Sequence, residues 1–569
     1  MVDTVDFFKK ISDYFWKQTK TNGSLICPRH RIEHTGKNVY SIIIDLELYK
    51  KTDQEQYFQR AKSRVRRTLQ NLVQDPDSGA RIFYPGRLNR WNMANSVIDA
   101  GACVDALSNF FLAYRDRLSE NEKKEISDAI FRVSDVYLKN AAVTKEITNQ
   151  RLWGATGLAM AWRIFKKDDW KRATLESVNK SLSEMWPDGT FPYHSFWRQY
   201  KIYEGIYDTT TFYQSRCIAF IYHILESLGE SLDKYKEKLI RATDLLTAMY
   251  QPDGVKNINL ECKRWYWLSS YEVVSNAFDV YALSKTYEIT GNKIYAYYAR
   301  KSLEKILRHQ LLDGGIDSHL GESQNNFQCR IFWNSHLAWL ARSANKIPQF
   351  SSENTKEYHY FSDSDILKFK NEYYSCILRG RKKPMNLMLG PAVGGGSLLY
   401  FGNARNKWEN SLVKGEGNFI FYAKENYWKN LKRYLISNKR EVKSRIYHTL
   451  VELHALNIRS FFVLLFTILK KILSSARAIY SSQWAVKVAI QKEGNKIIWQ
   501  VSPAKRCGRE LKGVKISREY VFEQNKLLVR EQLFLEHDVG KNIKYKYIPP
   551  CNAKSFSADG GNSYSYYLD

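Results

Sequence analysis

The most regular feature of the chain is the spacing of apolar residues in its first 345 positions. They recur at i, i+3, i+4 and i+7, which places them on one face of an α-helix. About a dozen such segments follow one another, with roughly 50–60 residues per helix pair. They begin near Val5, Val39, Asp53, Ala94, Glu120, Asn149, Asp169, Asp208, Leu232, Tyr271, Lys293 and Phe327.

Turn sequences recur between these helices. Asp-Ser-Gly or Asp-Gly follows amphipathic segments at 77–79, 188–189, 253–254 and 313–314, and an irregular stretch follows each turn. One helix pair, near Thr144, lacks the turn. Such pairs bury their apolar faces only against neighbours, so they stack into a solenoid or close into a toroid. Loops that recur at the same phase should gather at one end and line one cleft.

The pattern changes at residues 346–569. Short β-branched and aromatic runs, broken by Gly, Asn and Lys, occupy 358–403 and 484–547. Residues 486–501 and 518–537 alternate apolar and polar positions around a central turn, which is typical of β-hairpins. We predict an antiparallel β-sandwich.

A basic, helical insertion is expected at 425–482. It contains the apolar run Phe461–Leu469, which ends in Lys470 and Lys471. The run is too short to span a bilayer and suits either a helix at an anionic membrane surface or a hairpin packed on the sandwich. No other apolar run is expected to be long enough to span a bilayer.

The net charge of +28 favours an acidic partner, and the 15 Trp and 38 Tyr favour stacking on sugar rings. Nucleic acid is not expected, because zinc-finger spacing, RNP-like motifs and basic heptads are absent. The eight cysteines form no CxxC pair and no HExxH occurs, so neither a metal nor another cofactor is predicted. With no signal-peptide pattern, the sequence predicts a cytoplasmic or membrane-peripheral protein.

The stretch 186–208 (WPDGTFPYHSFWRQYKIYEGIYD) is unusually aromatic and polar for a connector. His194 and Tyr203 can each carry a proton, and Arg198 lies between them. Trp197 and Tyr207 offer flat faces suited to sugar rings. It is predicted to be a functional loop between two helices.

This stretch resembles the catalytic segment of hyaluronate and chondroitin lyases. The resemblance rests on Asp188–His194, Tyr203 and Gly205, and on the order of a helical half and a β half, which is also similar to heparinase II/III-like and alginate lyases. It implies an α+β multidomain fold, in which residues 1–345 form an (α/α)6-type toroid and residues 346–569 a β-sandwich. It also implies a polysaccharide lyase that cleaves uronate-containing polysaccharide by β-elimination, and proteins of this family are normally exported.

The same resemblance implies roles for individual residues. Tyr203 would be the base, the acid or both, with His194 assisting. Asn149 would bind the uronate carboxylate, and Arg264 would lie near the leaving group. The residues expected to bind substrate are Trp197, Arg198, Tyr207, Trp265 and His319.

Other interpretations stay open. Asn149 could cap its helix, Arg264 could stack on neighbouring aromatics, and His194 could be a structural hydrogen-bonding residue. His319 and His336 could form a second polar cluster. A glycoside hydrolase would need two carboxylates in the cleft, available from Asp188, Glu204, Asp208, Asp253, Glu261 and Asp317. The third alternative is a non-catalytic, membrane-peripheral glycan-binding protein in polysaccharide biosynthesis.

Overall fold

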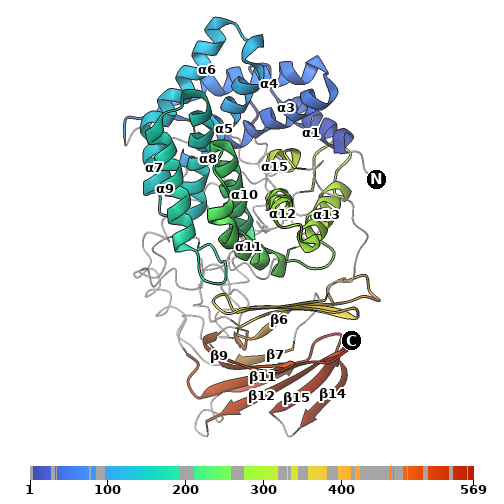
Figure 1. Cartoon of the computed structure of the whole chain (residues 1–569). Helices are drawn as coiled ribbons and strands as arrows, with labels where there is room; N and C mark the ends of the chain where they lie inside the picture. Colours follow the sequence, from blue (N-terminus) through green and yellow to red (C-terminus); the bar gives the residue numbers. More distant parts are fainter. Residues whose placement is uncertain are drawn as a thin grey trace. The chain divides into compact units, whose positions relative to one another are not determined.

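The structure is a computed structural model of the whole chain, shown in Figure 1. It describes residues 4–26, 33, 35–75, 78–84, 96–192, 211–254, 256–257, 275–317, 330, 335–343, 356–380, 395–411, 417–422, 462, 466, 479–483, 485–503, 510–536, 543–559 and 562–569. Contacts divide the chain into two units. The first comprises 1–196, 212–244 and 269–350, and the second comprises 197–211, 245–268 and 351–569.

Two classes of helix alternate along the first unit (Figure 1). We call the first class outer helices: α1 (Thr4–Gln18), α4 (Glu55–Gln70), α6 (Glu120–Arg132) with its continuation through η3 (Val133–Leu138) and α7 (Lys139–Thr144), α9 (Asp168–Glu184), α11 (Asp233–Ala248) and α13 (Lys293–Arg308). We call the second class inner helices: α3 (Tyr40–Thr52), α5 (Ser96–Tyr114), α8 (Thr148–Phe165), α10 (Thr211–Leu228), α12 (Asn276–Thr290) and α15 (Leu337–Ala341). Shorter elements are α2 (Thr35–Asn38), η2 (Arg115–Arg117), β1 (Leu72–Gln74) and β2 (Arg81–Phe83).

Burial separates the two classes. The outer helix α9 buries Trp170, Ala173 and Ser177, which are spaced three and four residues apart, so it has one buried face. The inner helix α8 is buried without a break over 148–161. An inner helix therefore has neighbours on every side, and any polar residue in it must find a partner inside the protein.

The turn at 186–190 has counterparts elsewhere in the unit. In turns 20–24, 186–190 and 311–315 the N–H of the first residue donates to the carbonyl of the fifth, at 2.9, 2.9 and 2.7 Å. The glycine at the fourth position has φ of 78°, 94° and 91°, a conformation that favours glycine. The turn at 251–254 shares the glycine, with φ of 91°. No such turn joins α7 to α8, as the sequence predicts.

These turns lock onto the next outer helix. A Cβ on Gly189 would lie 2.4 Å from the carbonyl oxygen of Arg241 in α11. A Cβ on Gly314, after α13, would lie 2.4 Å from the carbonyl oxygen of Lys10 in α1. Gln310 also donates to the carbonyl of Phe7 at 3.0 Å. Because the turn after the last outer helix packs on the first, the helical unit closes on itself.

Within its described residues, the second unit contains three antiparallel sheets. One has the order β3 (Glu357–Phe361), β4 (Ile366–Lys370), β5 (Tyr374–Arg379), β6 (Ser397–Asn403). Another has the order β13 (Lys544–Ile548), β7 (Asn418–Tyr422), β8 (Ile479–Ser481). The third has the order β14 (Lys554–Asp559), β15 (Ser563–Leu568), β12 (Leu527–Leu535), β11 (Val514–Phe522), β10 (Lys496–Pro503), β9 (Ala485–Glu493).

One hydrophobic core serves all three sheets, with Leu367, Phe419 and Trp499 among its buried members. A buried ion pair joins two neighbouring strands, β11 and β12, beside this core. Arg518 Nε donates to Glu531 at 2.7 Å, and both side chains are nearly inaccessible to solvent. Tyr547 donates its hydroxyl hydrogen to the same carboxylate at 2.6 Å.

Much of the predicted secondary structure is confirmed. Helices begin within three residues of every predicted start except Tyr271 and Phe327, which lie outside the described residues. The hairpins predicted at 486–501 and 518–537 are β9–β10 and β11–β12. The coarser expectation of helices followed by antiparallel sheets is met. The specific (α/α)6-type toroid with a β-sandwich, and the boundary at 345/346, stay predictions.

Two further expectations have different outcomes. The predicted insertion 425–482 lies outside the described residues except at 462, 466 and 479–482. The expectation that no apolar run is long enough to cross a membrane is wrong. The helical segment Val97–Arg117 is both long enough, at 21 residues, and apolar enough, with a mean hydropathy of 1.3. However, 72% of its apolar window is buried inside the protein, which is how a core helix meets the same test.

Candidate functional site

The N-terminal ends of the inner helices meet in a buried polar cluster, which we call the amino-end cluster. Its members are Lys37, Asp99, Asn149, Arg216 and His336, each less than a tenth exposed. Asn149 is included because it lies one helical turn before Trp153, which Lys37 and Arg216 both contact. The members come from the start of α3, α5, α8, α10 and α15 respectively, or from the residues just before those helices. Segments far apart in the sequence therefore converge at one end of the helical unit.

Close packing holds the first part of this cluster. The N–H of Gly36 donates to Asp99 Oδ1 at 3.0 Å, and a Cβ on Gly36 would lie 2.3 Å from the Asp99 Cα. Only glycine fits there. The next residue, Lys37, places its Nζ 3.9 Å from the centroid of the Trp153 ring. This cation–π contact partly replaces the water that the buried ammonium has lost.

Arg216 joins three inner helices. Its guanidinium carbon lies 5.1 Å from the ring centroid of Trp153 in α8 and 4.7 Å from that of Phe278 in α12. Its Nη2 is 3.1 Å from His336 Nε2. Burial, with the charges of Arg216 and Lys37, holds the pKa of His336 well below its ordinary value. His336 is therefore neutral and accepts a hydrogen bond from Arg216.

The cluster is electrostatically suited to anions. Burial lowers the pKa of Lys37 to about 7, with Asp99 opposing that shift and Arg216 adding to it. Lys37 is therefore partly protonated at neutral pH, beside a permanently charged Arg216. The N-terminal ends of helices add partial positive charge where they converge. Because the charges of Arg216 and Asp99 offset each other, the partial charge of Lys37 and the helix ends leave the cluster with a small net positive charge.

The start of the predicted catalytic stretch lies at the same end. Thr148 Oγ1, in the first turn of α8, donates to the carbonyl of Pro192 at 2.8 Å. Gln214 at the start of α10 accepts from the N–H of Phe191 at 3.0 Å and donates to the carbonyl of Gly189 at 2.8 Å. These bonds fix 189–192 against the first turns of α8 and α10, next to Asn149.

Asn149 does not cap its helix. The N-cap of α8 is Ile147, and no side chain makes a capping hydrogen bond there, so the capping interpretation is wrong. Asn149 lies inside the first turn, 3% exposed, and its buried Oδ1 has no hydrogen-bond partner among the described residues. A buried amide oxygen without a partner is unfavourable for folding.

The other predicted site residues lie outside the described residues. They are His194, Tyr203 and Arg264, and the proposed substrate-binding residues Trp197, Arg198, Tyr207, Trp265 and His319. Their convergence with Asn149 stays a prediction. His336, suggested as a partner of His319, is part of the amino-end cluster.

The sequence reading missed Lys37, Asp99 and Arg216. For Arg216 the sequence does contain a usable signal, because this cation directly precedes the largely apolar run CIAFIYHIL. Asp188, available to a hydrolase, has a structural function, since its Oδ1 accepts from the N–H of Thr190 at 3.0 Å. Within the described part of the chain, no three His, Cys, Asp or Glu side chains lie together as a metal site would require.

Comparison with known proteins gives neither a matching family model nor a matching curated protein. Among solved structures, this chain is similar to cellobiose 2-epimerase from Bacillus thermoamylovorans, at 12% identity and a TM-score of 0.43, over 60% of this chain and 100% of that one. It is similar to a polysaccharide lyase at 14% identity and a TM-score of 0.43, over 61% and 98%. It is also similar to a glycosyl hydrolase of family 88 from Bacteroides vulgatus at 14% and 0.43, over 61% and 100%.

Proposed function

We propose that this protein is a carbohydrate-active enzyme, and specifically a polysaccharide lyase that cleaves uronate-containing polysaccharide by β-elimination. The observation that carries the proposal is the amino-end cluster. There, two buried cations lie at converging helix N-termini with an amide oxygen that has no partner among the described residues, against the first residues of the stretch that resembles a lyase segment. The net charge of +28 fits an acidic polymer.

The chemistry requires the features of this end of the helical unit. A base removes the C5 proton of the uronate, a C4–C5 double bond forms, and the C4–O4 bond breaks as an acid protonates the leaving oxygen. Negative charge grows on the carboxylate side of the sugar during proton removal, so nearby positive charge lowers the barrier. In this proposal Lys37 and Arg216 supply the field, Asn149 Oδ1 accepts a hydrogen bond from a hydroxyl group of the bound sugar, and Tyr203 with His194 transfers the protons.

The test is turnover of hyaluronan, chondroitin, heparosan and alginate, followed by the ultraviolet absorbance of the unsaturated uronate, with dextran as the neutral control. Tyr203→Phe should abolish product formation. Tyr200→Phe and Tyr207→Phe are matched controls that remove a hydroxyl from the same stretch. Tyr203→Phe activity equal to these controls would reject the residue assignment, and no product from any uronate polymer would reject the lyase.

The hydrolase alternative predicts cleavage of glycan without the unsaturated chromophore. Its supply of carboxylates is reduced, because Asp188 is engaged in the turn. The membrane-peripheral alternative has one described feature in its favour. Phe462 and Phe466, one helical turn apart, are 60% and 69% exposed. Sedimentation with anionic liposomes, with and without residues 425–482, measures that property directly.

A further inference from the structure

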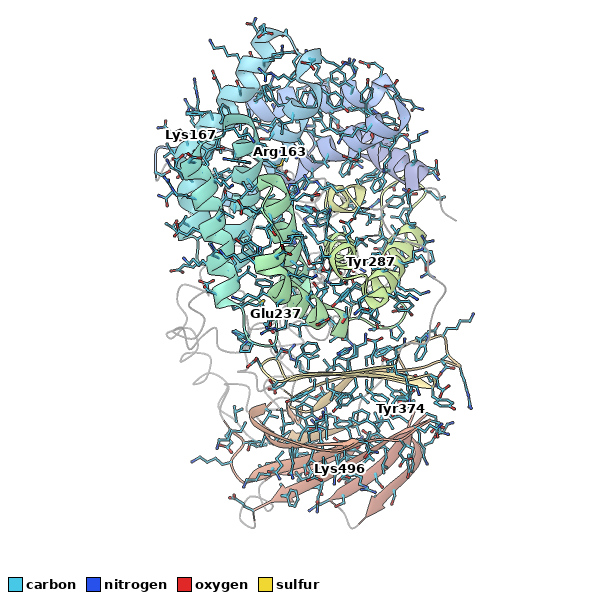
Figure 2. The ribbon with its side chains drawn as sticks, viewed as in Figure 1. Arg163, Lys167, Glu237, Tyr287, Tyr374 and Lys496 are labelled. Atoms are coloured by element: carbon cyan, nitrogen blue, oxygen red, sulfur yellow. The ribbon has the colours of Figure 1, made fainter. Side chains whose placement is uncertain are left out.

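A second polar site lies at the other end of the inner helices. A pocket of about 690 Å³ is lined by residues of α3, α8, α10 and α12, mostly from their C-terminal halves, by Asn109 of α5 and by Arg342 after α15. Arg163, labelled in Figure 2, is one of its lining residues and lies near the C-terminal end of α8. The amino-end cluster is built from the opposite ends of the same helices.

The base of this pocket is a fixed network of charged groups. Arg342 Nη2 donates to both oxygens of the fully buried Asp105, at 3.1 and 2.9 Å, and Asn109 donates to the same carboxylate at 2.9 Å. His223 Nε2 lies 3.3 Å from Asp105 Oδ1. Burial and the charge of Arg342 lower the pKa of His223, which is therefore neutral. Asp105 and Arg342 thus balance each other and are held rigidly.

Two N–H donors at this pocket have no hydrogen-bond partner among the described residues. They are Arg342 Nη1, on a side chain only 10% exposed, and the buried Nε1 of Trp162. Both residues line the pocket. A buried donor without an acceptor is costly in a folded protein. Two such donors at one cavity indicate that it receives an acceptor from outside the chain.

The charges around the pocket favour an anion. Lys50 pairs with Glu47 at 2.8 Å, and Lys285 pairs with Glu226 at 3.2 Å. Arg163 and Lys166 also line the pocket and have no carboxylate within ion-pair distance among the described residues. Lys166 Nζ instead lies 3.9 Å from the Trp162 ring centroid. After the pairs cancel, two positive charges remain.

We propose that this pocket is a binding site for a small, hydroxylated organic carboxylate, separate from the candidate active site. The carboxylate would accept from Arg342 Nη1 and Trp162 Nε1 under the field of Arg163 and Lys166. The carboxylates of Glu47 and Glu226 would accept hydrogen bonds from hydroxyl groups, and they disfavour a doubly charged anion such as phosphate.

The test is isothermal titration of the full-length protein with sodium glucuronate and with glucose at fixed ionic strength. Glucuronate should bind saturably, at least roughly tenfold more tightly than glucose, since loss of a charge-assisted hydrogen bond costs about a factor of ten. Arg163→Gln/Lys166→Gln should weaken glucuronate binding by a similar factor. Trp162→Phe, which removes only the N–H donor and part of the ring, should weaken it as well.

Suitable controls avoid the buried ion pair, because an Arg342 variant would leave Asp105 without its partner and unfold the protein. Lys124→Gln/Arg132→Gln removes the same charge from the exposed face of α6 and should leave binding unchanged. Asn149→Leu, which impairs the candidate active site at the opposite end, should retain a saturable glucuronate-binding step that the pocket substitutions weaken. Equal binding of glucose, no binding at all, binding insensitive to all three pocket substitutions, or binding lost in Asn149→Leu would each overturn the proposal.

Discussion

Replacing Asn149 by leucine tests whether Asn149 has a functional or a structural role. Leucine has nearly the same shape, and Asn149 Oδ1 is buried without a partner among the described residues. An unsatisfied buried polar atom costs about 1–3 kcal/mol, so its removal should raise the free energy of unfolding by about 1–2 kcal/mol. That corresponds to an increase of about 2–8 °C in the melting temperature of a large domain. Lyase activity should be lost.

The matched control is Asn276→Leu. Asn276 occupies the first residue of α12, is 1% exposed, and donates to Ser302 Oγ at 2.8 Å. Its replacement breaks that bond and leaves Ser302 buried beside an apolar group, so Asn276→Leu should be less stable than Asn149→Leu by about 1–2 kcal/mol. Differential scanning calorimetry of both variants gives the comparison. A destabilised Asn149→Leu, similar to the control, would show that Asn149 contributes to folding and would refute the reasoning.

Three further predictions follow from the structure. Affinity for acidic oligosaccharide should fall as the pH rises through about 7, where Lys37 loses its proton, and Lys37→Met should flatten that pH dependence in binding titrations. Stability should show the opposite trend. Because the pKa of Lys37 in the folded protein lies below its unfolded value of 10.5, the contribution of Lys37 to the free energy of unfolding should rise with pH between the two values. In urea unfolding, Gly189→Ala should lower the free energy of unfolding by about 2 kcal/mol or more, because φ is 94° and the new Cβ would collide with the Arg241 carbonyl. The control Gly229→Ala, with φ of 65° and open space around it, should lower it by about 1 kcal/mol. Equal losses of stability in the two variants would contradict the packing argument. Glu531→Gln should lower the free energy of unfolding by about 3–5 kcal/mol, because it leaves the buried charge of Arg518 uncompensated. The double variant Arg518→Met/Glu531→Met should lose less stability. An equal or greater loss in the double variant would show that the ion pair itself is strongly stabilising.

Sequence periodicity was informative where a helix has one apolar face. The outer helices, such as α9, begin within a few residues of their predicted starts. It was uninformative about the inner helices' ends, because α8 is buried on all sides and a continuous apolar run does not show which polar residues meet. Lys37 and Asp99 are separated by 62 positions, and only the return of the chain brings them together.

Turn chemistry was predicted in part. The Asp-Gly turns were recognised, but the turn at 20–24, built on Asn22–Gly23, was missed although asparagine provides the same acceptor for a nearby backbone N–H. The interpretation of Asn149 as a cap failed for a related reason. A sequence shows that asparagine lies near a helix start, but the position of the N-cap depends on the backbone of the preceding residues.

Closure of the helical unit has a consequence for synthesis. Gln310 donates to the carbonyl of Phe7 across 303 positions, so α1 obtains its final neighbour only after most of the helical unit has been made. At about 5–20 residues per second, that interval is on the order of 15–60 s. During that time the apolar side chains of Phe7, Phe8 and Ile11 have only part of their native surroundings. The nascent chain should therefore be a client for chaperones that shield exposed aromatic segments, and slower translation should lengthen its exposure to aggregation.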